Sequence, residues 1–323
     1  MITLSIALLA ALIIIGASYQ FVREKIDDYL YPPPGELVDV GGYHLHIHRS
    51  GKGGPSVILD AGIGCNSLEW ALVQKEIAKF TTVCSYDRAG YGWSDESPME
   101  RTSQNMVKEL HTLLLRSEIP GPYVLVGHSL GGVNVRLYAN TYPDEVVGVV
   151  LVDSAHEDQL AKLPMPNWNK GVLSSLTYLG ALRLLAVPHY NQSEPPLYSN
   201  LLPVFPEEFY KTQGMLPDEI QKMYIAKWST TKFTRTLLEE MEQLGVSFTQ
   251  LRNTKGLLNE KPLIVITADK TQPKEVWAEF QKDLVTKSSN GKQIVAIESG
   301  HLITRHQPEI IVEAVREIVL GSR

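Results

Sequence analysis

The most informative stretch of this sequence is Tyr123-Val124-Leu125-Val126-Gly127-His128-Ser129-Leu130-Gly131-Gly132. Its apolar, β-branched start is typical of a short buried strand, and residues 133–138 have the pattern of an amphipathic helix. The G-x-S-x-G turn between them is expected to hold Ser129 in a strained conformation, with its hydroxyl clear of the sheet. Gly127 and Gly131 suit this turn because it brings neighbouring backbone close together.

The composition predicts an ordered globular chain. The length of 323 residues allows one large α/β domain or two small ones. With 44% hydrophobic and 20% charged residues, the chain can form a sizeable core. The net charge of -6, without any basic stripe, argues against a nucleic-acid partner. Cys65 and Cys84 are expected to be free thiols, and no metal-binding spacing is present, so we expect no metal.

Residues 1–22 are predicted to form a transmembrane anchor. The run is apolar and uncharged up to Val22, is long enough to cross a bilayer, and has Tyr19 and Phe21 where an aromatic belt would lie. A cleaved signal peptide, which would give a secreted protein, is the alternative. Arg23 and Lys25 favour a cytoplasmic position for the rest of the chain, but neighbouring acidic residues leave the side open.

Residues 23–35, which include three consecutive prolines, are predicted to form a stiff linker that holds the following domain away from the membrane. Residues 36–323 then alternate between strand and helix patterns. Eight strands are predicted at 36–40, 43–49, 57–59, 82–86, 123–126, 146–152, 263–267 and 293–297. Helices are predicted at about 67–78, 103–116, 274–285 and 308–320.

This alternation predicts an α/β fold in which a mostly parallel eight-stranded sheet has helices on both faces. Residues from about 155 to 261 interrupt the rhythm, because they are helix-like, rich in leucine and aromatic residues and punctuated by prolines. We expect this segment to be a helical cap, inserted after the sixth strand and lying over the functional site.

Taken together, these features resemble the α/β-hydrolase-fold serine hydrolases over residues 36–320. The resemblance rests on Asp60-Ala61-Gly62-Ile63-Gly64, on residues 87–94, on the G-x-S-x-G turn and on Gly300-His301. It implies the α/β-hydrolase fold with Ser129 as nucleophile and His301 as base, since the family's histidine follows the last strand. His128, His306, His156 and His189 are the competing histidines.

The acid that orients the base departs from the common pattern. Many relatives place it in a G-x-x-D segment after the strand that corresponds to 263–267, and here Thr271 occupies that position. Asp269 lies two residues too early in the turn. Asp153 directly follows strand 146–152, where some members carry their acid, and it keeps the order Ser, Asp, His. We therefore expect Asp153, with Asp269 as the alternative; a helix cap would be a purely structural role for Asp153.

The resemblance also implies an oxyanion hole made by the backbone N–H groups of Ile63 and Leu130. The expected reaction is hydrolysis of a carboxylic ester or thioester through an acyl-enzyme on Ser129, without a cofactor, on a small-molecule or acyl-lipid substrate. A serine at this turn disfavours dehalogenase and epoxide hydrolase chemistry, which the family runs from an aspartate. Prolyl-type aminopeptidase, carbon–carbon bond hydrolysis, acyl transfer and a membrane-tethered non-catalytic receptor stay open as alternatives.

Overall fold

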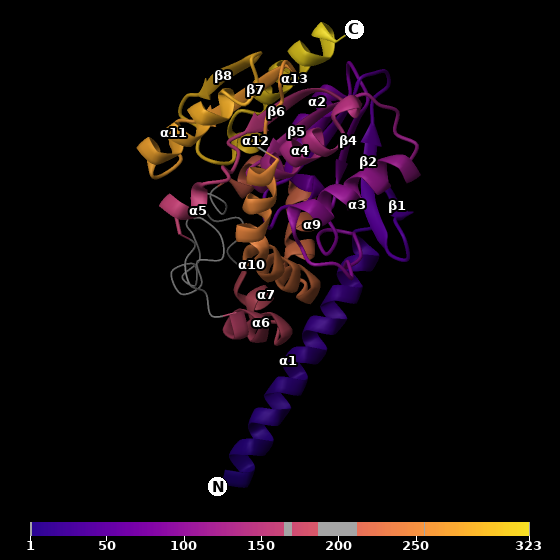
Figure 1. Cartoon of the computed structure of the whole chain (residues 1–323). Coiled ribbons are helices and arrows are strands. Elements are labelled where there is room, and N and C mark those ends of the chain that lie inside the picture. The colour runs from indigo at the N-terminus through magenta and orange to yellow at the C-terminus, as the bar shows by residue number, and fades with distance from the viewer. Residues whose placement is uncertain (1, 165–169, 187–211, 255, 323) are drawn as a thin grey trace.

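The computed structural model of the chain describes residues 2–164, 170–186, 212–254 and 256–322 (Figure 1). One eight-stranded sheet runs in the order β1-β2-β4-β3-β5-β6-β7-β8. Its strands are β1 (Glu36–Asp39), β2 (His44–Ser50), β3 (Ser56–Asp60), β4 (Val83–Tyr86), β5 (Tyr123–His128), β6 (Val146–Val152), β7 (Leu263–Ala268) and β8 (Gly291–Ala296). Only β1 and β2 pair antiparallel with their neighbours, so the sheet is mostly parallel, as predicted.

Helices cover both faces of this sheet. The helical elements of the α/β body are η1 (Ser67–Trp70), α2 (Ala71–Ile77), α3 (Ser103–Arg116), α4 (Leu130–Thr141), η2 (Pro143–Glu145), α11 (Lys274–Val285), α12 (Ile303–His306) and α13 (Pro308–Gly321). Residues of α3, α4 and α11 join the hydrophobic core on one face, and residues of α2 and α13 join the core on the other. Because β3 and β5 are buried along their whole length, they contain few polar side chains.

The cap lies between β6 and β7, as expected. Its described elements are α5 (Gln159–Lys162), α6 (Lys170–Tyr178), α7 (Ala181–Ala186), η5 (Gln213–Met215), α9 (Asp218–Trp228) and α10 (Thr231–Asn253). The hydroxyl of Thr230 accepts a hydrogen bond from Phe233 N and so caps the start of α10. The predicted cap residues 165–169, 187–211 and 255 lie outside the described part of the chain.

The N-terminal helix α1 (Ile2–Leu30) is longer than the predicted anchor. Residues 23–30, expected as part of a linker, continue the helix, so the connection to β1 is limited to residues 31–35. The second half of α1 packs against α6 and α9 of the cap (Figure 1), so the expected stand-off is wrong: the helix is docked onto the domain. Among the described helices, α1 alone is long and apolar enough to cross a membrane, judged by length and composition.

Candidate active site

Ser129 lies on the sharp turn between β5 and α4, with φ 52° and ψ -120°. A non-glycine residue with positive φ costs of the order of 1–3 kcal/mol, so surrounding contacts must hold it. Two glycines make the turn possible. A Cβ on Gly127 would lie 2.4 Å from the Gly131 carbonyl oxygen, and a Cβ on Gly131 would lie 2.2 Å from the Asp60 carbonyl oxygen. The steric reason predicted for both glycines is therefore present.

Asp153 and His301 meet at the same edge of the sheet, where β6 and β8 end. The Nδ1 atom of His301 lies 2.6 Å from Oδ2 of Asp153. The Asp153 carboxylate is fully buried, and a quarter of the His301 side chain is exposed. A buried carboxylate that accepts the Nδ1 proton leaves Nε2 of the ring as the proton acceptor.

Three donors besides His301 hold the Asp153 carboxylate. Its Oδ1 accepts hydrogen bonds from Ala268 N at 2.9 Å and from Trp277 Nε1 at 2.8 Å, and its Oδ2 accepts one from the Thr271 hydroxyl at 2.7 Å. Sequence reasoning placed Thr271 where many relatives carry their acid. In this structure the Thr271 hydroxyl donates a hydrogen bond to Asp153, which follows the neighbouring strand β6. Trp277 was missed, because nothing in its local sequence relates it to a residue 124 positions earlier.

The alternative acid, Asp269, has a different environment. It follows β7, and its amide donates to the Ala296 carbonyl. One carboxylate oxygen, Oδ1, is buried and accepts no hydrogen bond within the described part of the chain.

The loop that follows β3 lies against the nucleophile turn. A Cβ on Gly62 would lie 3.0 Å from His128 Nδ1 and 3.3 Å from Ser129 Cβ, so glycine allows this approach. The amides on both sides of Ile63 are bonded to buried side chains: Gly62 N donates to Glu69 and Gly64 N donates to the Tyr91 hydroxyl. These bonds fix the backbone of the loop around Ile63. The second predicted oxyanion donor, Leu130, is the first residue of α4, where an amide has no acceptor within the helix.

A buried ion pair supports this loop. The carboxylate of Glu69 contacts His128 Nδ1 through Oε1 and accepts the Gly62 amide through Oε2. His128 Nε2–H donates to the backbone carbonyl of His301 at 2.9 Å. The pair therefore links the loop after β3 to the backbone of His301, a role that the sequence analysis did not assign to His128 or Glu69.

The two charges of this pair stabilise each other. Burial alone would raise the pKa of Glu69, but the adjacent His128 ring and the Gly62 amide hold it below its ordinary value. Burial disfavours the charged His128 ring, yet the Glu69 carboxylate raises the pKa of His128 above its ordinary value. Both nitrogens of the His128 ring face oxygen acceptors, namely Glu69 Oε1 and the backbone carbonyl of His301.

Arg88 connects the same loop to the cap. Its guanidinium donates to the carbonyl oxygens of Ala61 at 2.6 Å and Gly62 at 2.8 Å, and it pairs with Asp60 at 2.8 Å. On its other side it pairs with Glu240 of α10 at 2.9 Å, and all three charged side chains are buried. Glu240 was missed, since 152 residues separate it from Arg88.

Other histidines lie in unrelated contacts. His156 pairs with Asp283 at 2.9 Å, and together with Glu157 they form the one described group that could hold a metal ion. Glu157 is already neutralised by Arg136 at 2.8 Å and Lys287 at 3.2 Å, which disfavours a cation there. His306 lies in α12, and His189 lies outside the described residues.

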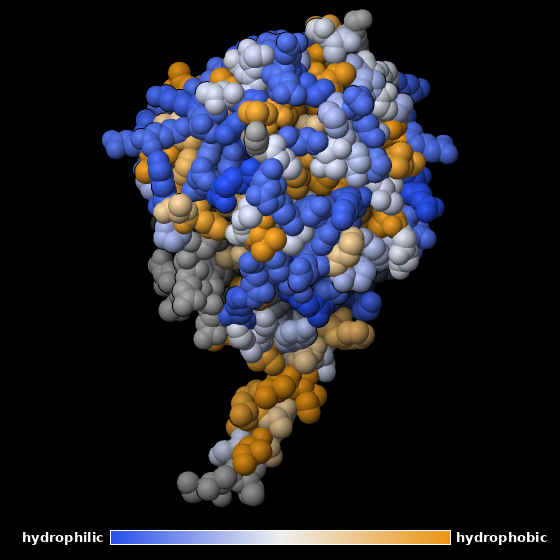
Figure 2. Space-filling model, in the orientation of Figure 1, coloured by the Kyte–Doolittle hydropathy of each residue, from blue (hydrophilic) through white to orange (hydrophobic). Residues whose placement is uncertain are grey.

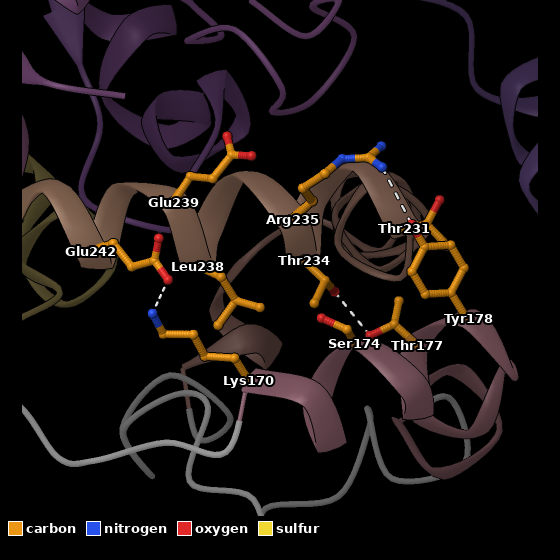
Figure 3. A pocket seen from close by; sticks show the side chains of 10 residues that line it. All are labelled: Lys170, Ser174, Thr177, Tyr178, Thr231, Thr234, Arg235, Leu238, Glu239 and Glu242. Atoms are coloured by element: carbon orange, nitrogen blue, oxygen red, sulfur yellow. Dashed lines mark hydrogen bonds and ion pairs between the residues drawn. The ribbon is translucent and has the colours of Figure 1, made fainter. Parts of the chain in front are cut away.

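A pocket of about 190 Å³ opens between α6 and α10 in the cap (Figure 3). Its lining is mixed and carries internal contacts: Lys170 pairs with Glu242, and the hydroxyls of Thr177 and Thr234 lie 3.0 Å apart. None of the predicted site residues lines it. This pocket is therefore separate from the edge of the sheet where Ser129 and His301 lie.

Comparison with known proteins supports this architecture. The family model of the alpha/beta hydrolase fold matches residues 55–304, and the chain belongs to the α/β hydrolase family. The chain is 25% identical to the uncharacterized protein YqjL of Bacillus subtilis over 285 residues, covering 87% of this chain and 89% of YqjL.

Solved structures share the fold but differ in chemistry. A thermophilic esterase from Thermogutta terrifontis superimposes with a TM-score of 0.60 at 20% identity, covering 87% of this chain and 96% of the esterase. A putative ancestral haloalkane dehalogenase gives a TM-score of 0.62 at 18% identity, covering 88% and 99%. At these identities the likeness concerns the fold, so the reaction must be argued from the site.

Proposed function

We propose that this protein is a serine hydrolase that cleaves a carboxylic ester or thioester through an acyl-enzyme on Ser129. The observation that carries the proposal is the 2.6 Å contact between His301 Nδ1 and Asp153 Oδ2, at the sheet edge where the strained Ser129 turn also lies. A serine hydroxyl is barely acidic, so it needs a base that a third group orients.

In the proposed reaction, His301 Nε2 takes the Ser129 proton as the hydroxyl oxygen attacks the carbonyl carbon of the substrate. Asp153 holds the ring by its Nδ1–H and stabilises the imidazolium that forms. The amides of Ile63 and Leu130 would donate to the oxyanion, and losing one such donor costs about 2.7–4 kcal/mol of barrier. His301 then returns its proton to the leaving group, and water hydrolyses the acyl-enzyme by the same route.

Labelling with a fluorophosphonate probe tests the nucleophile. The wild-type chain should form a covalent adduct on Ser129, and Ser129→Ala should lose it completely. Ser154→Ala is a suitable control, because this buried serine hydroxyl donates to the Ala155 carbonyl and has no proposed role in the reaction. Equal labelling of the wild type and Ser129→Ala would contradict the proposal, and an unlabelled wild type would favour the non-catalytic receptor.

We further propose that α1 is an uncleaved membrane anchor and that an acyl lipid is a substrate. Support comes from its apolar residues up to Val22, most of them exposed, including Ile6, Leu9 and Ile14 (Figure 2). The protein should stay in the membrane pellet after alkaline carbonate extraction, with an intact mass that includes residues 1–22.

A series of p-nitrophenyl esters tests the lipid substrate and should show a preference for long acyl chains. A preference for acetate would argue against a lipid substrate.

A further inference from the structure

The second half of α1 has an unusual distribution of polarity. Two of its polar side chains face the protein, since Gln20 is 2% exposed and Asp27 is 3% exposed, whereas Lys25 and Asp28 nearer the end of the helix are exposed. Its apolar side chains face outward, with Phe21 63% and Val22 52% exposed. A helix on the surface of a water-soluble domain shows the opposite arrangement. An apolar outer face is favourable where lipid replaces water.

The polar face of α1 is bonded to the cap. Gln20 Nε2 donates to the Ser229 carbonyl, and Asp27 forms a buried ion pair with Arg183 of α7. Arg183 also donates to the Ser229 carbonyl at 3.1 Å. Because removing one partner of a buried pair leaves an uncompensated charge, α1 and the cap hold a defined position relative to each other.

The turn between α6 and α7 touches α1 well inside its apolar run. A Cβ on Gly16 would lie 2.7 Å from the Leu179 carbonyl oxygen, and a Cβ on Gly180 would lie 2.7 Å from the Tyr19 ring. Glycines on both partners allow the backbones to approach closely. We call residues 172–184, with this turn, the cap corner; Figure 1 shows α6 and α7 beside α1, at the end of the domain nearest the N-terminus.

Helix length then sets the depth of the cap corner. A span of the hydrocarbon needs about 20 residues, so an anchor that starts at Ile2 reaches Phe21 or Val22. Gly16 lies six residues before Val22, which is roughly 9 Å along the helix axis at 1.5 Å per residue. The turn at Leu179, which packs against Gly16, must therefore lie deeper in the membrane than Val22, where the apolar run ends.

The cap corner has side chains suited to that position. Val172 is 44% exposed, Tyr178 is 49% exposed and Leu184 is 57% exposed. We propose that the cap corner and the outward face of α1 are immersed together in the lipid bilayer, at the boundary between headgroups and acyl chains. The depth of roughly 9 Å agrees with the 5–10 Å at which interfacial helices lie. This inference rests on the proposed anchoring by α1 and identifies the bilayer itself as the partner of the cap.

Depth-dependent quenching in the full-length chain tests this inference. A thiol-reactive NBD probe is attached to Val172→Cys or Leu184→Cys, and the protein is reconstituted into phosphatidylcholine–phosphatidylglycerol vesicles that carry spin-labelled lipids. Leu12→Cys reports on the middle of α1. Leu320→Cys is the matched control, since it is 57% exposed like Leu184 but lies near the C-terminus at the other end of the molecule (Figure 1). The native Cys65 and Cys84 are buried and should not react.

The expected result is that shallow spin labels remove about half of the fluorescence at both cap positions and almost none at Leu320, with deep labels quenching Leu12 most. If Leu12 is quenched and the cap positions behave like Leu320, the inference is overturned and the anchor stands. If Leu12 is not quenched, the anchoring proposal fails and this inference fails with it. None of these outcomes depends on catalysis.

Photo-crosslinking of the unsubstituted protein is a second measurement, which needs no substitution. A phospholipid with a diazirine near its headgroup should give adducts on peptides from residues 170–186. Adducts on α1 peptides alone would overturn immersion of the cap corner.

Discussion

The two sides of the candidate active site are held in different ways. On the side of the proposed acid, called the acid side, Asp153 is surrounded by neutral donors from the α/β body: the Ala268 amide, the Thr271 hydroxyl and the Trp277 indole. On the side of the proposed oxyanion donors, called the oxyanion side, the loop after β3 is held by buried charges, namely Glu69 with His128 and Arg88 with Glu240. The oxyanion side has a described buried ion pair to α10 of the cap, between Arg88 and Glu240, whereas no residue that bonds the Asp153 carboxylate has a described ion pair to α10.

This difference shows which part of the site depends on the cap. The neutral donors to Asp153 come from β7, from the loop after it and from α11, so the acid side needs no contribution from α10. Buried charges must be neutralised, and Arg88 takes one of its carboxylates from α10. Changes in the cap should therefore reach the oxyanion loop before they reach Asp153.

The largest expected effect separates the two candidate acids. Asp153→Asn should lower kcat by about 10⁴-fold, because the amide cannot hold His301 in the tautomer with its proton on Nδ1 or stabilise the imidazolium. Asp269→Asn, the matched control, should leave kcat nearly unchanged. Ester turnover and circular dichroism of both variants check this. A large loss with Asp269→Asn and none with Asp153→Asn would move the acid to the end of β7.

The next effect tests the connection to the cap. Glu240→Gln removes one charge from a buried pair and should lower the free energy of unfolding by about 3–5 kcal/mol, measured by urea denaturation in detergent micelles. Glu239→Gln is the matched control, because its side chain is exposed one position earlier in α10. Its effect should stay within about 0.5 kcal/mol. Equal stabilities of the two variants would contradict the comparison between the two sides.

A smaller, pH-dependent effect is expected from the Glu69–His128 pair. The pKa of His128 is raised, so its contribution to stability is fully present below its ordinary value of 6.5 and is lost as the pH rises through the raised value. The pKa of Glu69 is lowered, so its contribution is present above its ordinary value of 4.5 and is lost as the pH falls through the lowered value. The pair should therefore stabilise the fold most between the two ordinary pKa values, from pH 4.5 to pH 6.5.

Urea denaturation at pH 5.5 and at pH 9 measures this dependence. The loss of unfolding free energy in Glu69→Gln, relative to the wild type, should be about 3 kcal/mol at pH 5.5 and clearly smaller at pH 9. Glu76→Gln controls for general effects of removing a carboxylate, since Glu76 pairs with Lys79 on the surface of the protein. A loss in Glu69→Gln that does not change with pH would show that the pair is not charged in the folded protein.

The smallest effect concerns one neutral donor on the acid side. Thr271→Val removes one hydrogen bond to Asp153 and should cost about 0.5–1.5 kcal/mol, at most about a tenfold fall in kcat. Thr286→Val, at an exposed position just after α11, should leave kcat unchanged. A loss in Thr271→Val as large as that in Asp153→Asn would mean that a single neutral donor decides the orientation of the acid.

Much of the fold was predictable from local patterns. The helix at 103–116, the helix at 274–285 and the strand at 146–152 have the predicted bounds, because their apolar periodicity and flanking turn residues act over a few positions. The end of α1 was not predictable in this way. Three prolines suggested a linker from residue 23, whereas the helix continues to Leu30 and its polar residues bond to partners about 150–210 positions later.

In the candidate site, too, some features follow from local sequence and others depend on long-range contacts. The Ser129 turn, the glycines around it and the position of His301 after the last strand can be read from short motifs, because strained turns demand particular residues next to each other in the chain. Which carboxylate meets His301, and how Arg88, Glu69 and α10 hold the loop at Ile63, depends on strand order and on the packing of the cap. Those contacts join residues up to 152 positions apart, and no local pattern in a chain specifies such pairings.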